Sequence, residues 1–209
     1  MSRDIIIIGA GGHARVIADI ISRGNDNLVG FLDDDLDKIG KCIYDDKKVI
    51  GRICDGVKYK NVFFIIGIGS NAVRMSIANK YDYNWCTLID SSAIIGNNVK
   101  IGEGTVIMPG VVINTGSIIG SHCIINTCSS IDHDNTIEDF VHISPGSHLA
   151  GTVFVGSLTW ICMGVNVINN ISIGKNNIIG AGATVLKNID SQGKIYIGTP
   201  AIDMELRNG

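Results

Sequence analysis

The chain has 209 residues, of which 45% are hydrophobic and 18% charged, as is typical of one or two folded domains. A net charge of −3 gives no electrostatic basis for binding nucleic acid or an anionic membrane, so we expect neither partner. The N-terminus does not fit a signal peptide, since a single basic residue, Arg3, precedes a short apolar run, and no apolar run approaches the ~20 residues of a membrane span. We therefore expect a cytoplasmic protein with six reduced cysteines.

Residues 1–88 predict a Rossmann-like parallel sheet. The apolar run over residues 4–8 indicates a buried strand, which glycines break before a helical pattern begins. Further strands are expected over residues 28–32, 61–66 and 85–89, and Gly67-Ile68-Gly69-Ser70-Asn71 leads into a second helix. A strand, a glycine loop, a helix and a strand form a βαβ unit, whose ligands bind at the C-terminal ends of the strands.

The first glycine loop fits the dinucleotide fingerprint, because Gly9-x-Gly11-x-x-Ala14 is followed about twenty residues later by Asp33. Only one mononucleotide half fits into 88 residues, which favours a nucleotide or a nucleotide sugar over a dinucleotide. The alternative is that the glycines only let a strand turn tightly into a helix.

The other polar residues of this half also have two interpretations. His13 either contacts a phosphate at the helix N-terminus or merely starts the helix. Asp33 and Asp34 either accept hydrogen bonds from ribose or base, or serve as turn residues. Gly69 either lets a ligand approach or relieves a tight turn.

The second half, residues 89–209, is built on a six-residue repeat. From Ile89 to Asp190 every one of seventeen hexads begins with Ile, Leu or Val, and thirteen carry Ala, Ser, Thr, Cys or Val in the fifth position. Such a period is typical of a parallel β-helix. The first and fifth positions face the same side of a strand, so they fill a narrow triangular prism.

Three hexads make one coil, so residues eighteen apart should stack about 4.8 Å from each other. His133 and Asp134 fall at a corner of the prism, where Gly151 stacks over His133 and leaves space for a substrate. The alternative is an exposed corner histidine without a function.

His142 follows His133 by nine residues, which is half a coil. The two side chains should therefore lie on opposite sides of the prism, and a site that uses both must form between subunits. Trp160 should stack on His142, and an outward Trp and His indicate an interface. His148 is a second candidate for that interface, and His122 is interpreted as a surface residue.

Nearly the whole chain resembles the left-handed β-helix acyltransferases with an N-terminal Rossmann-like domain, namely the nucleotide-4-amino-sugar N-acetyltransferases and the sialic acid O-acetyltransferases. The segments that carry the resemblance are Ile8-Gly9-Ala10-Gly11-Gly12-His13, Phe31-Leu32-Asp33-Asp34, Ile68-Gly69-Ser70-Asn71, Ile131-Asp132-His133-Asp134, Phe140-Val141-His142-Ile143-Ser144-Pro145, Ile179-Gly180-Ala181-Gly182-Ala183 and Gly198-Thr199-Pro200-Ala201. The resemblance implies the left hand of the helix, a homotrimer, and acetyl-CoA bound between subunits without a metal.

The resemblance also implies roles for single residues. His133 is similar to the general base of the family, and Asp134 to its acidic neighbour. His142 matches a position that contacts the acetyl group, and Met163 and Ala181 match positions along the pantetheine arm. The positions implied for binding the nucleotide sugar are Gly11, Gly12, His13, Asp33, Asp34 and Gly69.

The resulting hypothesis is an acetyl-CoA-dependent N-acetyltransferase that acts on the C4 amine of a nucleotide-linked 4-amino-deoxy sugar in bacterial surface glycan biosynthesis. The amine attacks the thioester directly, with His133 as base. The alternatives are a sialic acid O-acetyltransferase, a serine O-acetyltransferase and a non-catalytic β-helix scaffold. A β-helix carbonic anhydrase would need His133, His142 and His148 to converge on a metal.

Overall fold

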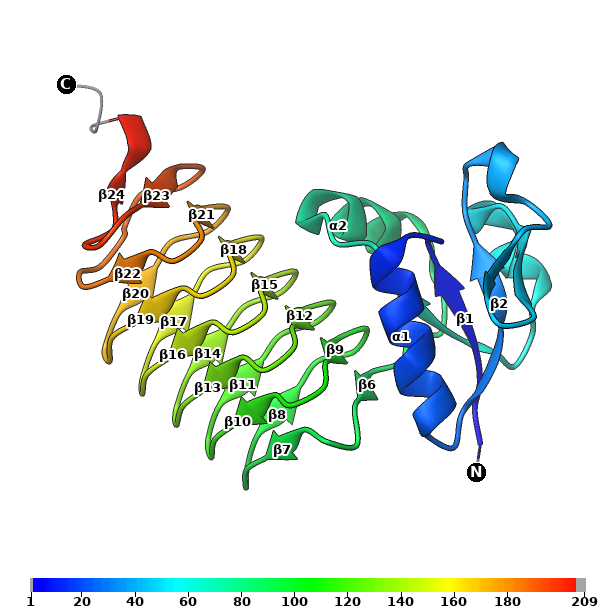
Figure 1. The fold of residues 1–209 in the computed structure, drawn as a ribbon, viewed down its shortest axis with the longest axis horizontal. Coiled ribbons are helices and arrows are strands. Elements are labelled where there is room, and N and C mark those ends of the chain that lie inside the picture. The colour runs from blue at the N-terminus through cyan, green and yellow to red at the C-terminus, as the bar shows by residue number, and fades with distance from the viewer. Residues whose placement is uncertain (1, 206–209) are drawn as a thin grey trace.

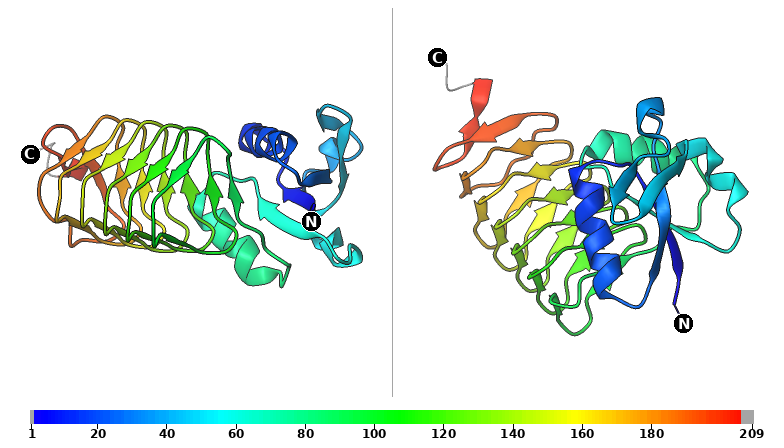
Figure 2. Two further views of the ribbon diagram at one scale, coloured as in Figure 1. Left: turned by 90° about the horizontal axis from the view of Figure 1, so that it is seen from below. Right: turned by 45° about the vertical axis from the view of Figure 1, so that its right-hand side comes forward.

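The structure is a computed structural model, and it describes residues 2–205 (Figures 1 and 2). An N-terminal α/β domain is followed by a left-handed, three-sided parallel β-helix, as predicted. The β-helix extends away from the α/β domain, so its C-terminal strands lie at the far end of the molecule (Figure 1).

The α/β domain is built on a five-stranded sheet in the order β3-β4-β2-β1-β5. All neighbouring strands pair in parallel except β3, which pairs antiparallel with β4 at the edge. The strands are β1 (Asp4–Ile8), β2 (Asn27–Leu32), β3 (Cys42–Tyr44), β4 (Lys47–Gly51) and β5 (Phe63–Ile66). The helices are α1 (Gly12–Arg23), α2 (Asn71–Lys80) and two 3-10 turns, Leu36–Lys38 and Ile53–Lys58. The β3–β4 hairpin is not among the predicted elements, because its lysines conceal the apolar pattern.

Strand β1 is buried on both faces, which explains its unbroken apolar run. Ile5 and Ile7 belong to the same hydrophobic cluster as Ile17 of α1. Ile6 and Ile8 belong to a second cluster that includes Ile77 of α2. The two helices therefore cover opposite faces of the sheet, and the loops at the C-terminal ends of its strands stay open.

The β-helix has three faces of short parallel strands. The first face contains β7 (Ile94–Ile95), β10 (Val112–Ile113), β13 (Ser130–Ile131), β16 (His148–Leu149), β19 (Asn166–Val167) and β22 (Thr184–Val185). The second face contains β8 (Lys100–Ile101), β11 (Ile118–Ile119), β14 (Thr136–Ile137), β17 (Phe154–Val155) and β20 (Ser172–Ile173).

The third face is the one nearest to α2 (Figure 1). It contains β6 (Leu88–Ile89), β9 (Val106–Ile107), β12 (Ile124–Ile125), β15 (His142–Ile143), β18 (Trp160–Ile161), β21 (Ile178–Ile179), β23 (Ile195–Ile197) and β24 (Ile202–Asp203). Paired residues on all three faces are eighteen apart through most of the stack, which confirms the predicted coil.

The interior of the β-helix follows the two predicted inward positions. Five stacked isoleucines on the third face are fully buried, namely Ile107, Ile125, Ile143, Ile161 and Ile179. Polar residues in the fifth position are also buried, because each donates to a backbone carbonyl. Thr105 Oγ1 lies 2.7 Å from the Gly120 oxygen, and Asn135 Nδ2 lies 3.0 Å from the Ala150 oxygen. The fifth position thus selects small or hydrogen-bonding side chains.

The single strand predicted over residues 85–89 is wrong. Trp85 forms only an isolated bridge to Phe64 of the α/β sheet, whereas Leu88 in β6 already pairs with Val106 of the β-helix. The chain passes from one sheet to the other between these residues, so β6 spans the expected boundary at residues 88 and 89. Arg23 of α1 also bridges the two parts through an ion pair of 2.5 Å to Asp90.

Replacing Ile143 with alanine should destabilise the protein by about 2–5 kcal/mol, because it leaves a cavity in a stack that cannot collapse. The matched control is Ile94→Ala in β7, whose side chain is 64% exposed, with a loss of about 0.5 kcal/mol or less. Equilibrium unfolding in denaturant measures both. Equal losses in the two variants would contradict the inward assignment of the first position.

Candidate active site

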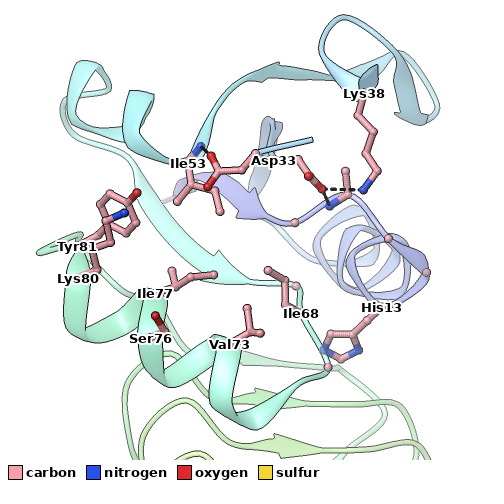
Figure 3. A pocket seen from close by; sticks show the side chains of 17 residues that line it. His13, Asp33, Lys38, Ile53, Ile68, Val73, Ser76, Ile77, Lys80 and Tyr81 are labelled. Carbon is pink, nitrogen blue, oxygen red and sulfur yellow. Dashed lines mark hydrogen bonds and ion pairs between the residues drawn. The ribbon is translucent and has the colours of Figure 1, made fainter. Parts of the chain in front are cut away.

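A cavity of about 660 Å³ opens at the C-terminal ends of β1, β2 and β5 (Figure 3). Its volume lies within the range of small-molecule sites. The glycine loop and α1 form one wall, while Val73, Ile77 and Tyr81 line it from α2 and the residue that follows it. The six residues predicted to bind a substrate all line this cavity: Gly11, Gly12, His13, Asp33, Asp34 and Gly69.

The glycines around this cavity serve two different purposes. A Cβ atom added to Gly11, Gly12 or Gly69 would meet no atom within 4 Å, so these residues face open space. A Cβ on Gly67 would come within 2.8 Å of the Ala14 Cβ, so Gly67 allows β5 to pack against α1. Among the residues that the structure describes, no side chain caps the N-terminus of α1. Its free N–H groups therefore remain available to an anion in the cavity.

The structure gives Asp33 a structural task. Its carboxylate accepts hydrogen bonds from the Ala10 and Asp35 amides at 2.8 and 2.9 Å and from Lys38 Nζ at 3.0 Å. Burial alone raises the pKa of Asp33, but these hydrogen bonds outweigh it and the pKa is lowered. Asp33 thus holds the glycine loop to the end of β2. Within the described residues Asp34 accepts one hydrogen bond, from the Ile53 amide to Oδ1 at 3.1 Å, and the same oxygen lies 3.7 Å from Arg52 Nε.

A second cavity, of about 570 Å³, lies between the start of α2 and the third face of the β-helix. His142, Leu158 and Trp160 line it from the β-helix, and Ser70 and Asn71 line it from α2 and its N-cap. Gly69 lines both cavities, which therefore adjoin each other at the loop between β5 and α2.

His142 is buried within its own chain. Only 8% of the residue is exposed, and its ring stacks on Trp160 with centroids 5.8 Å apart. The predicted stacking of the two rings is confirmed, but the sequence did not indicate that the α/β domain covers this histidine. Burial, followed by the charge of Arg74, lowers the pKa of His142 from 6.5 to about 3.

The neighbours of His142 also determine which ring nitrogen carries the proton. The Asn126 amide is oriented by the Thr127 amide, which donates to Asn126 Oδ1 at 2.8 Å. Asn126 Nδ2 then donates to His142 Nε2 at 3.1 Å. The proton of the neutral ring consequently lies on Nδ1, which is buried and has no hydrogen-bond partner within residues 2–205. The neutral ring of His142, a lining residue of the second cavity, therefore carries a buried N–H donor, and its low pKa makes it a weak base.

His13, which lines the first cavity, is likewise a histidine with a buried ring nitrogen. Its Nε2 atom is buried and has no partner within the described residues. Burial, followed by the charge of Arg74, lowers the pKa of His13 to about 4. Two neutral imidazoles thus face the region where the cavities adjoin.

His133 and Asp134 form a pair in the turn from β13 to β14, away from both cavities. His133 Nδ1 lies 2.9 Å from Asp134 Oδ2, and 52% of the His133 side chain is exposed. The hydrogen bond to Asp134, followed by the charge of Asp132, raises the pKa of His133. The hydrogen bond places a proton on Nδ1, so Nε2 faces solvent as an acceptor.

Two glycines in the neighbouring coils make room for this pair. A Cβ on Gly151, one coil above, would lie 2.5 Å from His133 Nε2, as the predicted stacking requires. A Cβ on Gly116, one coil below, would clash with Asp134 Oδ1. The orientation of both side chains therefore depends on the absence of a side chain at these two positions.

The interpretation of His122 as a surface residue is wrong. Only 5% of it is exposed, and its ring stacks on Phe140 and meets the edge of Trp85. The α/β domain covers this corner, which the repeat alone could not reveal.

His148 is exposed on the first face, where Nδ1 lies 2.8 Å from Ser130 Oγ. Because His133, His142 and His148 lie at a corner and on two different faces, they do not converge within one chain.

Met163 and Ala181 stack in the turns that follow β18 and β21. The Gly182 amide donates to the Met163 oxygen at 2.9 Å, and the Met163 side chain is largely exposed. Both residues thus lie at the edge of the third face. They are farther along the β-helix than His142, in the coil of Trp160 and in the next coil. Asn126, Asn71 and Arg74 contact the site but were not predicted, because their partners lie far away in sequence.

No helix within residues 2–205 is long and apolar enough to cross a membrane. The same residues contain no cluster of three or more His, Cys, Asp or Glu side chains that could hold a metal ion.

Two protein-family models match the chain. Residues 4–81 match the PglD N-terminal domain, and residues 92–127 match the bacterial transferase hexapeptide repeat. Among curated proteins, UDP-N-acetylbacillosamine N-acetyltransferase from Bacillus subtilis is 38% identical over 107 residues, which are 48% of this chain and 49% of that protein. The chain spans about half of this relative, and less of the other curated relatives that it matches.

Solved structures match the whole chain. Perosamine N-acetyltransferase from Caulobacter crescentus, in complex with CoA and GDP-perosamine, superimposes with a TM-score of 0.89 at 30% identity over 96% of both chains. The acetyltransferase domain of PglB from Neisseria gonorrhoeae, in complex with acetyl coenzyme A, gives a TM-score of 0.91 at 30% identity. This match covers 98% of this chain and 100% of the other.

The two histidines should titrate differently in a pH series of NMR spectra. His133 should protonate with a midpoint above 6.5 because Asp134 favours its charged form, and Asp134→Asn should lower that midpoint. His142 should stay neutral from about pH 8 down to about pH 5, because burial holds its pKa at about 3. A His142 midpoint near 6.5 would contradict the burial described here.

Proposed function

The chain belongs to the hexapeptide-repeat acetyltransferases of the nucleotide-4-amino-sugar N-acetyltransferase and sialic acid O-acetyltransferase family, and from this premise we propose its reaction. The protein transfers the acetyl group of acetyl-CoA to the C4 amine of a nucleotide-linked 4-amino-deoxy sugar. The observation that carries the proposal is that a cavity at the N-terminus of α1 adjoins a cavity lined by His142, whose buried Nδ1–H group has no hydrogen-bond partner among residues 2–205. By the family resemblance, the product serves bacterial surface glycan biosynthesis.

The first cavity suits the nucleotide sugar. A diphosphate fits the open glycines Gly11 and Gly12, where the free N–H groups of α1 favour negative charge. Asp34 and Gly69 are the proposed contacts to the rest of the nucleotide sugar, and Asp33 keeps the glycine loop in shape. The sugar then reaches toward Gly69 and His13, where the two cavities adjoin.

The second cavity suits the acetyl end of acetyl-CoA. Its lining includes Trp160, Ile178 and Ile195, which are apolar surfaces for a thioester and a pantetheine arm. The Nδ1–H group of His142 has no partner in the described chain and can donate to the thioester oxygen. Met163 and Ala181, at the edge of the same face, are proposed contacts farther along the arm.

We assign the proton transfer to His133 and Asp134 of a neighbouring subunit in a homotrimer. The pair lies half a coil from His142 and lines neither cavity of its own chain. In a ring of three copies, the corner between the first and second faces of one copy can approach the third face of the next. The site is then complete only in the assembly.

The chemical step is a direct attack. The amine nitrogen bonds to the acetyl carbon, the bond from that carbon to sulfur breaks, and the sulfur leaves as a thiolate. The nitrogen loses its proton to Nε2 of His133, which is free because Nδ1 is held by Asp134. The raised pKa makes His133 a better base. Activity should therefore rise with pH as the imidazole becomes neutral.

Replacing His133 with alanine should lower kcat by about 10²–10⁴-fold, while binding of acetyl-CoA, measured by calorimetry, is retained. The assay uses UDP-, GDP- and dTDP-linked 4-amino sugars as acceptors, with free and CMP-activated sialic acid as the alternatives. His148→Ala is the matched control and should retain wild-type kcat, since Nδ1 of His148 is paired with the Ser130 hydroxyl and not with a carboxylate such as the one that orients His133.

Three outcomes would count against the proposal. Unchanged kcat in His133→Ala would remove this histidine from the mechanism. Transfer to sialic acid alone would make the protein an O-acetyltransferase. Loss of activity in His148→Ala together with bound zinc would favour a metal enzyme with three histidines.

A further inference from the structure

Arg74 of α2 is the largest fully buried side chain of the described residues, with an exposure of 1%. It lies at the junction between the α/β domain and the β-helix, and it lines neither of the two cavities. A buried cation ordinarily requires a carboxylate partner. Within residues 2–205 no carboxylate pairs with Arg74.

The guanidinium is instead surrounded by uncharged oxygen atoms from both parts of the chain. On the β-helix side, Nε donates to the His122 oxygen at 3.0 Å and Nη2 donates to the Phe140 oxygen at 3.0 Å. On the α/β side, Nη1 donates to the Gly69 oxygen at 2.9 Å and Nη2 donates to Asn71 Oδ1 at 2.9 Å. One side chain thus joins the loop after β5 to two coils.

Asn71 extends this contact to a third coil. Its Nδ2 atom donates to the Leu158 oxygen at 2.8 Å, while its Oδ1 atom accepts from Arg74. His122, Phe140 and Leu158 are each eighteen residues apart, and all have left-handed backbone, with φ of 53°, 60° and 63°. Their carbonyl oxygens form a ladder along the corner that leads into the third face, and the first turn of α2 is attached to three of its steps.

This attachment fixes the place where the two cavities adjoin. Gly69 lines both cavities, and its carbonyl is held by Arg74. His142 lies two residues after Phe140, which the same guanidinium holds. Arg74 therefore contacts both the loop that the two cavities share and the backbone close to His142.

We propose that Arg74, together with Asn71, is a positioning residue that holds the nucleotide-sugar cavity at the correct spacing from the His142 cavity. The inference rests on the proposed function, because the spacing matters only if the two cavities hold the two reactants of one transfer. Small misplacements of bound reactants reduce rates far more than they reduce binding.

Lysine cannot replace this residue. The guanidinium directs five N–H donors in a fixed plane, whereas an ammonium has three donors and no fork. Arg74→Lys keeps the charge but cannot reach the Gly69 and His122 oxygens together. Asn71→Ala removes one acceptor of Arg74 and the contact to Leu158, but it leaves the guanidinium with its Gly69, His122 and Phe140 oxygens. It is therefore the milder variant, chosen in case Arg74→Lys does not fold.

The experiment compares Arg74→Lys and Asn71→Ala with Arg23→Lys. Arg23 also joins the two parts of the chain, but it does so through Asp90 and not through Gly69, the residue that both cavities share. We expect kcat to fall by about 10²-fold in Arg74→Lys and by less in Asn71→Ala. The dissociation constants of CoA and of GDP, UDP or dTDP should each stay unchanged in Arg74→Lys, because Arg74 lines neither cavity, and Arg23→Lys should match the wild type in kcat.

Hydrogen exchange provides a readout that needs no acetyl acceptor. Arg74→Lys should accelerate exchange both in residues 67–72 and in the coil corners at residues 120–123 and 138–141, whereas Arg23→Lys should not. Unchanged exchange in these segments, or unchanged kcat, would overturn the proposal. A wild-type protein that acetylates no sugar would overturn the proposed function instead, and the exchange data would still decide whether Arg74 joins the loop to the coils.

Discussion

One coil of the β-helix takes eighteen residues, so each side chain stands directly over the residue eighteen positions earlier. This spacing places Trp160 against the ring of His142, and it leaves an empty position above the ring of His133 because residue 151 is a glycine. It also separates the two histidines by half a coil. The eighteen-residue coil therefore sets the relative positions of the residues in the candidate site.

The α/β domain gives the two histidines different chemistry. It covers His142, so burial keeps this imidazole neutral and Asn126 fixes the proton on Nδ1. It does not cover His133, which stays half exposed beside a carboxylate and becomes more basic. The same residue type is thus a hydrogen-bond donor in one place and a base in the other, as environment dictates.

The repeat made much of this predictable from the sequence. The coil and the space at Gly151 follow from counting in sixes, whereas the pairing of His133 with Asp134 was implied by the family resemblance. The burial of His122 could not be predicted from the repeat. It depends on the α/β domain, an earlier part of the chain that packs on that corner through Arg74. The structural task of Asp33 was equally hidden, because a carboxylate after a strand fits both a ligand contact and a loop anchor.

The central claim is that His133 of one copy serves the cavities of another, and coexpression of two defective variants tests it most directly. His133→Ala removes the base, while Gly11→Asp puts a negative charge into the open glycine loop without a steric clash. If neighbouring subunits share the site, random mixing in a trimer should restore about a quarter of the sites. Each variant alone should be inactive. Mixed assemblies without activity would show that one chain must supply every part, and they would contradict this account.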